Sequence, residues 1–157
     1  MYRPMKKFME AAIDEAIQAR EDGDYGVGAV IVKDGKVITR ASNRSKRDED
    51  PTAHAEVIAI REAARVFGTR HLKGCVLYAT HEPCPMCAST AVWAMLDGIV
   101  YGAKMEDMIK YRKVKANNNW LWRSIHIPAA KVLAKGEPKL FLVREFMSEE
   151  CKRLFHS

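Results

Sequence analysis

Apolar and polar positions follow two different periods in the N-terminal part of the chain. Between residues 4 and 20 the apolar side chains recur every three or four positions, which predicts an amphipathic helix with one face in the core. Residues 28–32 form an unbroken apolar run, which is typical of a buried strand. Asp34 and Gly35 then provide a hairpin turn, so we expect a second strand over residues 36–41.

The middle of the chain alternates helices and strands. Residues 52–67 have helical spacing of apolar side chains, with Thr52 as the expected N-cap. Residues 75–80 and 98–102 have the composition of buried strands, and residues 83–96 predict a second core helix between them. Because strands that alternate with helices tend to pair in parallel, this order predicts an α/β sheet with parallel neighbours.

The pattern is weaker after Ala103. Residues 104–123 are polar and basic, and we expect a loop with a short helix there. Residues 140–143 are the last apolar run and predict a fifth strand, and Ser148 is the expected cap of a final short helix. No internal repeat or second boundary interrupts the pattern, so residues 1–157 are predicted to form a single domain.

Composition excludes several classes of protein. Hydrophobic residues make up 48% and charged residues 29% of the chain, which is ordinary globular usage. No apolar run approaches the roughly 20 residues of a membrane span, and acidic side chains interrupt the N-terminus where a signal peptide would be apolar. We therefore expect a cytoplasmic protein without membrane contact. The formal net charge of +6 leaves nucleic-acid binding open, because clustered Lys and Arg side chains are typical of it.

Three side chains that bind soft metals stand at predicted helix starts. His54 lies in T-A-H-A-E, and Cys84 and Cys87 lie in E-P-C-P-M-C. Residues three apart on a helix share a face, so both thiolates can reach one point. Zinc takes Cys sulfur and His nitrogen as ligands, and without a secretory signal a C-x-x-C pair favours metal over a disulfide. The sequence therefore predicts a Zn²⁺ cofactor on these residues.

The number of ligands separates two kinds of zinc site. A structural site is closed by four protein ligands, whereas a catalytic site has three and keeps one position for water. A fourth ligand would have to come from His71 or His81, and the chain would then be a non-catalytic, zinc-stabilised binding module. Glu56, two residues after His54, favours the catalytic alternative, because its carboxylate can move a proton from metal-bound water to a leaving group.

H-x-E followed by P-C-x-x-C is the signature of zinc deaminases. With G-A-V-I-V-K-D-G, D-P-T-A-H-A-E and L-Y-A-T beside these motifs, residues 4–103 resemble the cytidine deaminase-like superfamily, in the branch of guanine, cytosine and tRNA adenosine deaminases. The resemblance implies a three-layer α/β/α sandwich with a five-stranded mixed sheet, a homodimer, and a zinc-dependent hydrolase that releases ammonia. It also implies that Glu56 is the proton shuttle, and that Asn43 and the main chain at Ala55 and Cys84 contact the substrate.

The resemblance points to two classes of substrate. Residues 92–94, V-W-A, are similar to guanine deaminases, although we expect Trp93 to pack in the core or in the dimer interface. Val27 is another expected substrate contact. At this position the chain resembles tRNA adenosine deaminases, since guanine deaminases usually have Phe there. The two segments therefore favour different substrates.

The segment after the fourth predicted strand decides our expectation. The tRNA enzymes carry a Gly-Ala-rich stretch there, whereas residues 104–115 of this chain are basic. Trp120 and Trp122 are instead candidates for a lid that excludes water from a small base. We therefore expect deamination of a small free nucleobase of the guanine or cytosine type. The alternative is a tRNA adenosine-to-inosine deaminase, in which the basic segment would contact RNA.

Overall fold

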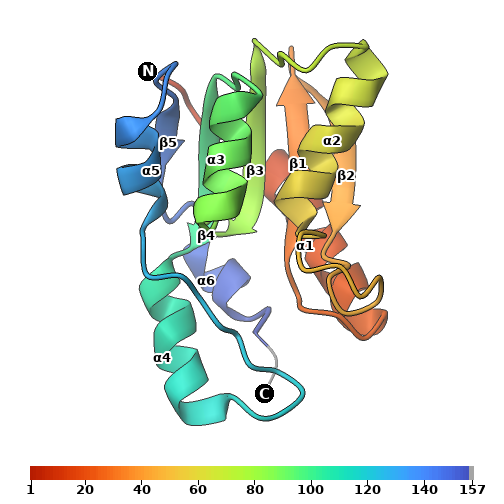
Figure 1. Cartoon of the computed structure of the whole chain (residues 1–157), viewed down its shortest axis with the longest axis vertical. Helices are drawn as coiled ribbons and strands as arrows, with labels where there is room; N and C mark the ends of the chain where they lie inside the picture. The colour runs from red at the N-terminus through yellow and green to blue at the C-terminus, as the bar shows by residue number, and fades with distance from the viewer. Residues whose placement is uncertain (156–157) are drawn as a thin grey trace.

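A five-stranded mixed sheet forms the centre of the molecule (Figure 1). The computed structural model describes residues 1–155. Its strands are β1 (Gly28–Lys33), β2 (Lys36–Ser42), β3 (Cys75–His81), β4 (Gly98–Ala103) and β5 (Phe141–Val143). The strand order is β2-β1-β3-β4-β5; β1 is antiparallel to β2 and β3, whereas β3, β4 and β5 are parallel. The predicted mixed sheet is therefore confirmed.

Helices cover both faces of this sheet. One face carries α2 (Ala55–Phe67), α3 (Pro85–Trp93) and α5 (Ala129–Lys135), and the other carries α1 (Lys6–Glu21) and α6 (Ser148–Lys152). The remaining helix, α4 (Met105–Lys115), lies beyond the end of the sheet (Figure 1). This arrangement confirms the expected three-layer α/β/α fold. No helix within residues 1–155 is long and apolar enough to cross a membrane.

The central strands contribute side chains to two separate cores, because successive residues of a strand point to opposite faces. In β1, Ala29 and Ile31 pack under α2 and α3, whereas Val30 and Val32 pack against α1. Each large side chain buried in this way contributes about 1.5–3 kcal/mol to the free energy of unfolding. Burial on both faces is the reason that these strands appear in the sequence as unbroken apolar runs.

The helix after the charged loop begins later than predicted. The backbone N–H and the hydroxyl of Thr52 both donate to Oδ1 of Asp50, at 2.8 and 2.7 Å, so Thr52 closes a turn instead of capping a helix. α2 begins at Ala55 and has His54 as its N-cap residue, in extended conformation. The Thr52 cap is therefore wrong, and the correction places the imidazole of His54 at the start of the helix.

Other boundaries also differ from the prediction. α3 begins at Pro85, with Cys84 as its N-cap residue, and ends at Trp93. Ser148 is the first residue of α6, and the N-cap is Met147. α5 was not predicted, because its seven residues are too few to show a helical period.

Candidate active site

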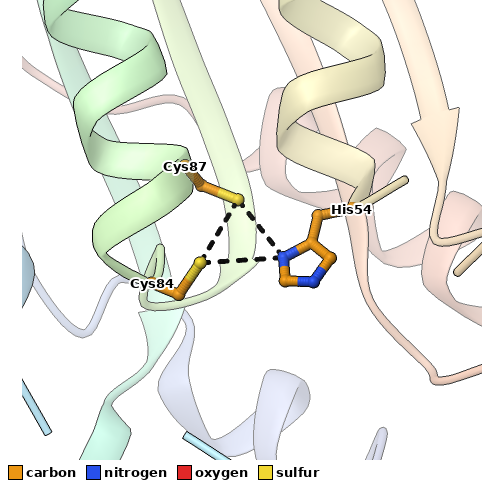
Figure 2. A group of neighbouring side chains, drawn as sticks. All are labelled: His54, Cys84 and Cys87. Atoms are coloured by element: carbon orange, nitrogen blue, oxygen red, sulfur yellow. Dashed lines mark hydrogen bonds between the residues drawn. The ribbon is translucent and has the colours of Figure 1, made fainter. Parts of the chain in front are cut away.

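Two helix N-termini meet at one end of the sheet and bring three metal-binding side chains together. His54 and Cys84 are the N-cap residues of α2 and α3, and Cys87 lies in the first turn of α3. Nδ1 of His54 lies 3.7 Å from Sγ of Cys84 and 3.4 Å from Sγ of Cys87, and the two sulfur atoms are 3.6 Å apart (Figure 2). These three side chains therefore converge on one point.

The distances fit a tetrahedral zinc ion. With Zn–S bonds of about 2.3 Å and Zn–N bonds of about 2.1 Å, tetrahedral angles place neighbouring ligand atoms about 3.6–3.8 Å apart. His71 is exposed, and within residues 1–155 neither His71 nor His81 joins the group. Three protein ligands are the number found in catalytic zinc sites.

Hydrogen bonds among the three ligand side chains shift their pKa values in the zinc-free chain. Hydrogen bonds from Cys87 and from His54 lower the pKa of Cys84 to about 4, while the hydrogen bond to Cys84 raises the pKa of Cys87 well above its usual value. The hydrogen bond with Cys84 also raises the pKa of His54. Cys84 is therefore a thiolate before a metal binds, and a bound cation would favour loss of the proton of Cys87 as well.

Glu56 is buried in the first turn of α2, next to the metal ligands. Burial raises the pKa of its carboxyl group to about 7, from an ordinary value of 4.5. Its Oε1 has no hydrogen-bond partner among residues 1–155 and is inaccessible to solvent. A carboxyl group with a pKa near neutrality and an unpaired oxygen beside a metal site has the properties of a proton carrier.

His54, Glu56 and Cys84 border a cavity of about 530 Å³, large enough for a nucleobase and part of its sugar. The inner wall is formed by residues that precede β4 in the sequence, among them Tyr25, Val27, Asn43, His54, Glu56 and Cys84. The outer wall is formed by residues 104–125, among them Lys104, Met108, Leu121, Trp122, Arg123 and Ile125. The two walls thus come from separate parts of the chain.

The expected substrate contacts differ in their positions. Val27 and Asn43 lie in the inner wall, as a contact with substrate requires. Ala55, the first residue of α2, is fully buried in the core and does not line the cavity. Trp122 is buried in the outer wall, whereas Trp120 stands outside the cavity lining. Of the two lid candidates, only Trp122 therefore borders the cavity.

Glu82 holds the outer wall in place, a role that the sequence did not suggest. Its Oε1 accepts a hydrogen bond from the backbone N–H of Met105 and its Oε2 from that of Ala129, both at 2.9 Å. The carboxylate thus accepts hydrogen bonds at the N-termini of both α4 and α5, where negative charge is stabilised. Glu82 stands in the E-P-C motif, but its partners are 23 and 47 residues away in sequence. Hydrogen bonds between residues so far apart leave no recognisable pattern in the sequence.

Tyr25 links the two walls and was also missed. Its hydroxyl accepts a hydrogen bond from the backbone N–H of Leu121 at 3.0 Å. Its ring lies edge to face with Trp120 and Trp122, at centroid distances of 5.1 and 4.9 Å. Tyr25 therefore orders the loop that carries both tryptophans.

The comparison with protein families decides the identity of the site. Residues 3–103 match the family model of the cytidine and deoxycytidylate deaminase zinc-binding region. The chain belongs to this family. It carries the zinc-binding region of this family, as the signature predicted, and His54, Cys84 and Cys87 are the side chains that could hold the zinc.

Relatives of this chain are named for more than one kind of substrate. The tRNA-specific adenosine deaminase of Aquifex aeolicus is 45% identical over 96 residues, which cover 61% of this chain and 64% of the relative. The guanine deaminase of Bacillus subtilis is 38% identical over 123 residues, which cover 78% of this chain and 77% of the relative. The chain thus spans less than two thirds of the length of the first of these relatives.

A solved structure extends the similarity to most of the chain. It comes from a study of A-to-I editing by tRNA:A34 deaminases at the wobble position of transfer RNA. The TM-score is 0.73 at 31% identity, and the match covers 96% of this chain and 100% of that chain. It therefore includes most of the residues that follow the family match.

These findings contradict the expected free-base substrate. The tRNA-specific relative is more similar in sequence than the guanine deaminase, and a structure from a study of tRNA deaminases matches almost the whole chain. Trp93, in the segment that is similar to guanine deaminases, is not in the core but 82% exposed on α3. The basic segment after β4, which decided the expectation, forms α4 and part of the outer wall. Neither feature is specific to a pocket for a small base.

Proposed function

We propose that this deaminase converts adenosine to inosine in the anticodon loop of a tRNA. The match to a tRNA:A34 deaminase structure over 96% of the chain carries the proposal. The match matters because it continues past the shared zinc site into the outer wall, where the substrate would be selected. The similarity to the Aquifex aeolicus enzyme supports the same substrate.

The outer wall has charges suited to a polynucleotide. No ion pair within residues 1–155 neutralises four exposed basic side chains on α4, which are Lys110, Arg112, Lys113 and Lys115. Arg123 adds a further charge at the cavity itself. Because Lys and Arg side chains bind phosphates, this arrangement supports an RNA substrate more than a free base.

The chemistry follows from the inner wall. In our proposal His54, Cys84 and Cys87 bind zinc, and Glu56 is the catalytic acid and base. Bound zinc supplies a Lewis acid that lowers the pKa of a water ligand to about 7. Glu56 accepts one proton from the water and donates it to the ring nitrogen beside the reacting carbon. It then accepts the proton of the hydroxyl group newly attached to that carbon and donates it to the departing amino group. A C–O bond forms and the C–N bond breaks, so that adenosine and water give inosine and ammonia.

Apolar side chains complete the proposed binding site for the base. Val27 in the inner wall and Trp122 in the outer wall would contact the two sides of the purine ring. We assign to Trp122 the exclusion of water, since its side chain is itself only 4% exposed. The large exposed side chain of Trp93 is assigned to a homodimer interface, because tryptophan is enriched in protein interfaces relative to the rest of the surface.

Inosine formation in an RNA stem-loop tests the proposal. The zinc-loaded protein is incubated with an anticodon stem-loop that carries one adenosine at the wobble position, and inosine is measured after nuclease digestion. We expect inosine with wild-type protein and none with Glu56→Gln at equal zinc content. Release of ammonia from guanine or cytosine, without inosine in the stem-loop, would contradict the proposal.

A further inference from the structure

Asp24 is a fully buried acidic residue next to the cavity, between α1 and β1. Its Oδ1 accepts hydrogen bonds from the backbone N–H of Tyr25 at 2.8 Å and from Nδ2 of Asn43 at 2.9 Å. Its Oδ2 accepts from the backbone N–H groups of Lys46 and Arg47, at 3.0 and 2.9 Å. One carboxylate thus connects the start of the inner wall with the loop that follows β2.

These contacts determine which end of the Asn43 amide faces Asp24. A carboxylate accepts hydrogen bonds and does not donate them, so the Asn43 atom beside it has to be the nitrogen. The second N–H of this nitrogen is directed at Oγ of Ser45, 3.0 Å away. Both hydrogens of the amide are therefore engaged, and the carbonyl oxygen Oδ1 is the atom that Asn43 can offer to a ligand.

Asn43 lies in the same cavity wall as His54, Cys84 and Glu56. An acceptor at this place requires a donor on the substrate. An adenosine within a polynucleotide has only two donor groups, the exocyclic amine and the 2′-hydroxyl, because its ring nitrogens accept and its other hydroxyls are esterified. The amine is the leaving group and belongs at the zinc site, so the 2′-hydroxyl is the donor that remains.

We propose that Asp24 is a positioning residue that holds the amide of Asn43 with its oxygen toward the cavity, where it accepts a hydrogen bond from the 2′-hydroxyl of the target nucleotide. This inference rests on the proposed function and adds a selectivity to it. Since the 2′-hydroxyl distinguishes RNA from DNA, the deaminase prefers a ribonucleotide at the target position. Asp24 acts through Asn43 and does not itself touch the substrate.

Two substrates that differ by one oxygen atom test the inference. Both are the same RNA stem-loop, one with adenosine and one with 2′-deoxyadenosine at the target position, and kcat/KM is measured for each. Wild-type protein should prefer the ribonucleotide by about tenfold, the effect of one hydrogen bond whose loss leaves a carbonyl unpaired. Asp24→Asn and Asn43→Ala should both reduce this preference to nearly one, mainly by slowing the reaction of the ribonucleotide.

Asp22→Asn is the matched control. Asp22 lies two residues earlier, and its carboxylate pairs with the guanidinium of Arg47 at 2.9 Å without contacting Asn43. This variant should keep the full preference for the ribonucleotide. Equal kcat/KM for both substrates in wild-type protein, or an unchanged preference in Asp24→Asn, would overturn the inference. No inosine from either substrate would contradict the proposed function and remove the inference with it.

A measurement on wild-type protein covers the case in which Asp24→Asn does not fold. The side-chain amide signal of Asn43 is assigned in an NMR spectrum by its absence from Asn43→Ala, and its hydrogen exchange is recorded. Two hydrogen bonds in a buried site should make this exchange much slower than that of the exposed Asn118 side chain. Equal exchange rates for the two side chains would show that the amide is not held.

Discussion

The two walls of the cavity differ in their origin and in their burial. The inner wall lies within residues 3–103, which match the deaminase family, and its metal ligands and Glu56 are held at the starts of two packed helices. The outer wall begins where that match ends, and much of residues 104–125 is exposed. The difference indicates that the metal ligands and the basic residues of the outer wall lie on separate segments, which can be altered independently.

Side-chain contacts from the inner wall hold the loop of the outer wall. Lys46 donates a hydrogen bond to the carbonyl of Asn119 at 3.1 Å, and its ammonium lies 4.3 Å from the ring centroid of Trp120. Tyr25 adds the hydrogen bond from Leu121. Because these contacts are exposed or partly exposed, each contributes little to the free energy of unfolding. Substitutions in the outer wall should therefore change binding while leaving the zinc site intact.

The largest effect is expected from Glu56→Gln in the inner wall. Glutamine keeps the shape of the side chain but cannot carry a proton, so kcat for inosine formation should fall by about 10³-fold or more. Zinc content, measured by elemental analysis, should stay the same. Glu62→Gln is the control on the same helix, at a partly exposed position paired with Arg65, and should retain full activity. Activity of Glu56→Gln within tenfold of wild type would exclude the assigned role.

The same substitution should stabilise the zinc-free protein at neutral pH. The pKa of Glu56 is about 7 in the folded chain and 4.5 in an ordinary environment, so the folded state binds this proton more tightly. Stability from this group is then present below pH 4.5 and is lost as the pH rises toward 7. Two-state urea unfolding should show wild type losing about 3 kcal/mol relative to Glu56→Gln across this interval. Parallel pH profiles would contradict the raised pKa.

The inner wall was largely predictable from sequence, because its chemistry is local. His54 and Glu56 are two residues apart, and Cys84 and Cys87 share one helical turn, so residue type and spacing were sufficient to predict a common site. The sheet was predictable for a similar reason, since burial on both faces produces unbroken apolar runs. What the spacing did not show was the late start of α2, because Asp50 engages Thr52 in a turn.

The outer wall was less predictable, because its supports are distant in sequence. Glu82 holds the starts of two helices, and Tyr25 meets a loop 96 residues away. The spacing of apolar and polar residues along the chain does not predict contacts of this kind. The substrate was mispredicted for the same reason, since it was inferred from the composition of residues 104–115 without their position along the cavity.

Charge on α4 should control RNA binding with a smaller effect than the inner wall. Replacement of Lys113 and Lys115 by Gln removes two exposed charges and should weaken stem-loop affinity by about tenfold at low salt. The slope of log affinity against log salt should decrease by about 1.5, whereas kcat at saturating RNA should remain unchanged. The matched control replaces Lys131 and Lys135, two exposed lysines of α5, and should alter neither quantity. Equal losses in both double variants would mean that α4 has no special part in binding.

The smallest effect is expected from Trp122→Phe, compared with Trp93→Phe. Trp122 is 4% exposed, and its ring lies 4.9 Å from that of Tyr25 and 4.9 Å from that of Phe155, measured between centroids. A smaller ring should lower the free energy of unfolding by about 1–2 kcal/mol and raise KM for the stem-loop about threefold, with little change in kcat. Trp93 is 82% exposed, so Trp93→Phe should change the free energy of unfolding by no more than about 0.5 kcal/mol in the monomer. Sedimentation of both variants shows whether Trp93 contributes to a dimer. An unchanged KM in Trp122→Phe would remove this tryptophan from the binding site and leave the outer wall with its charges alone as the source of selectivity.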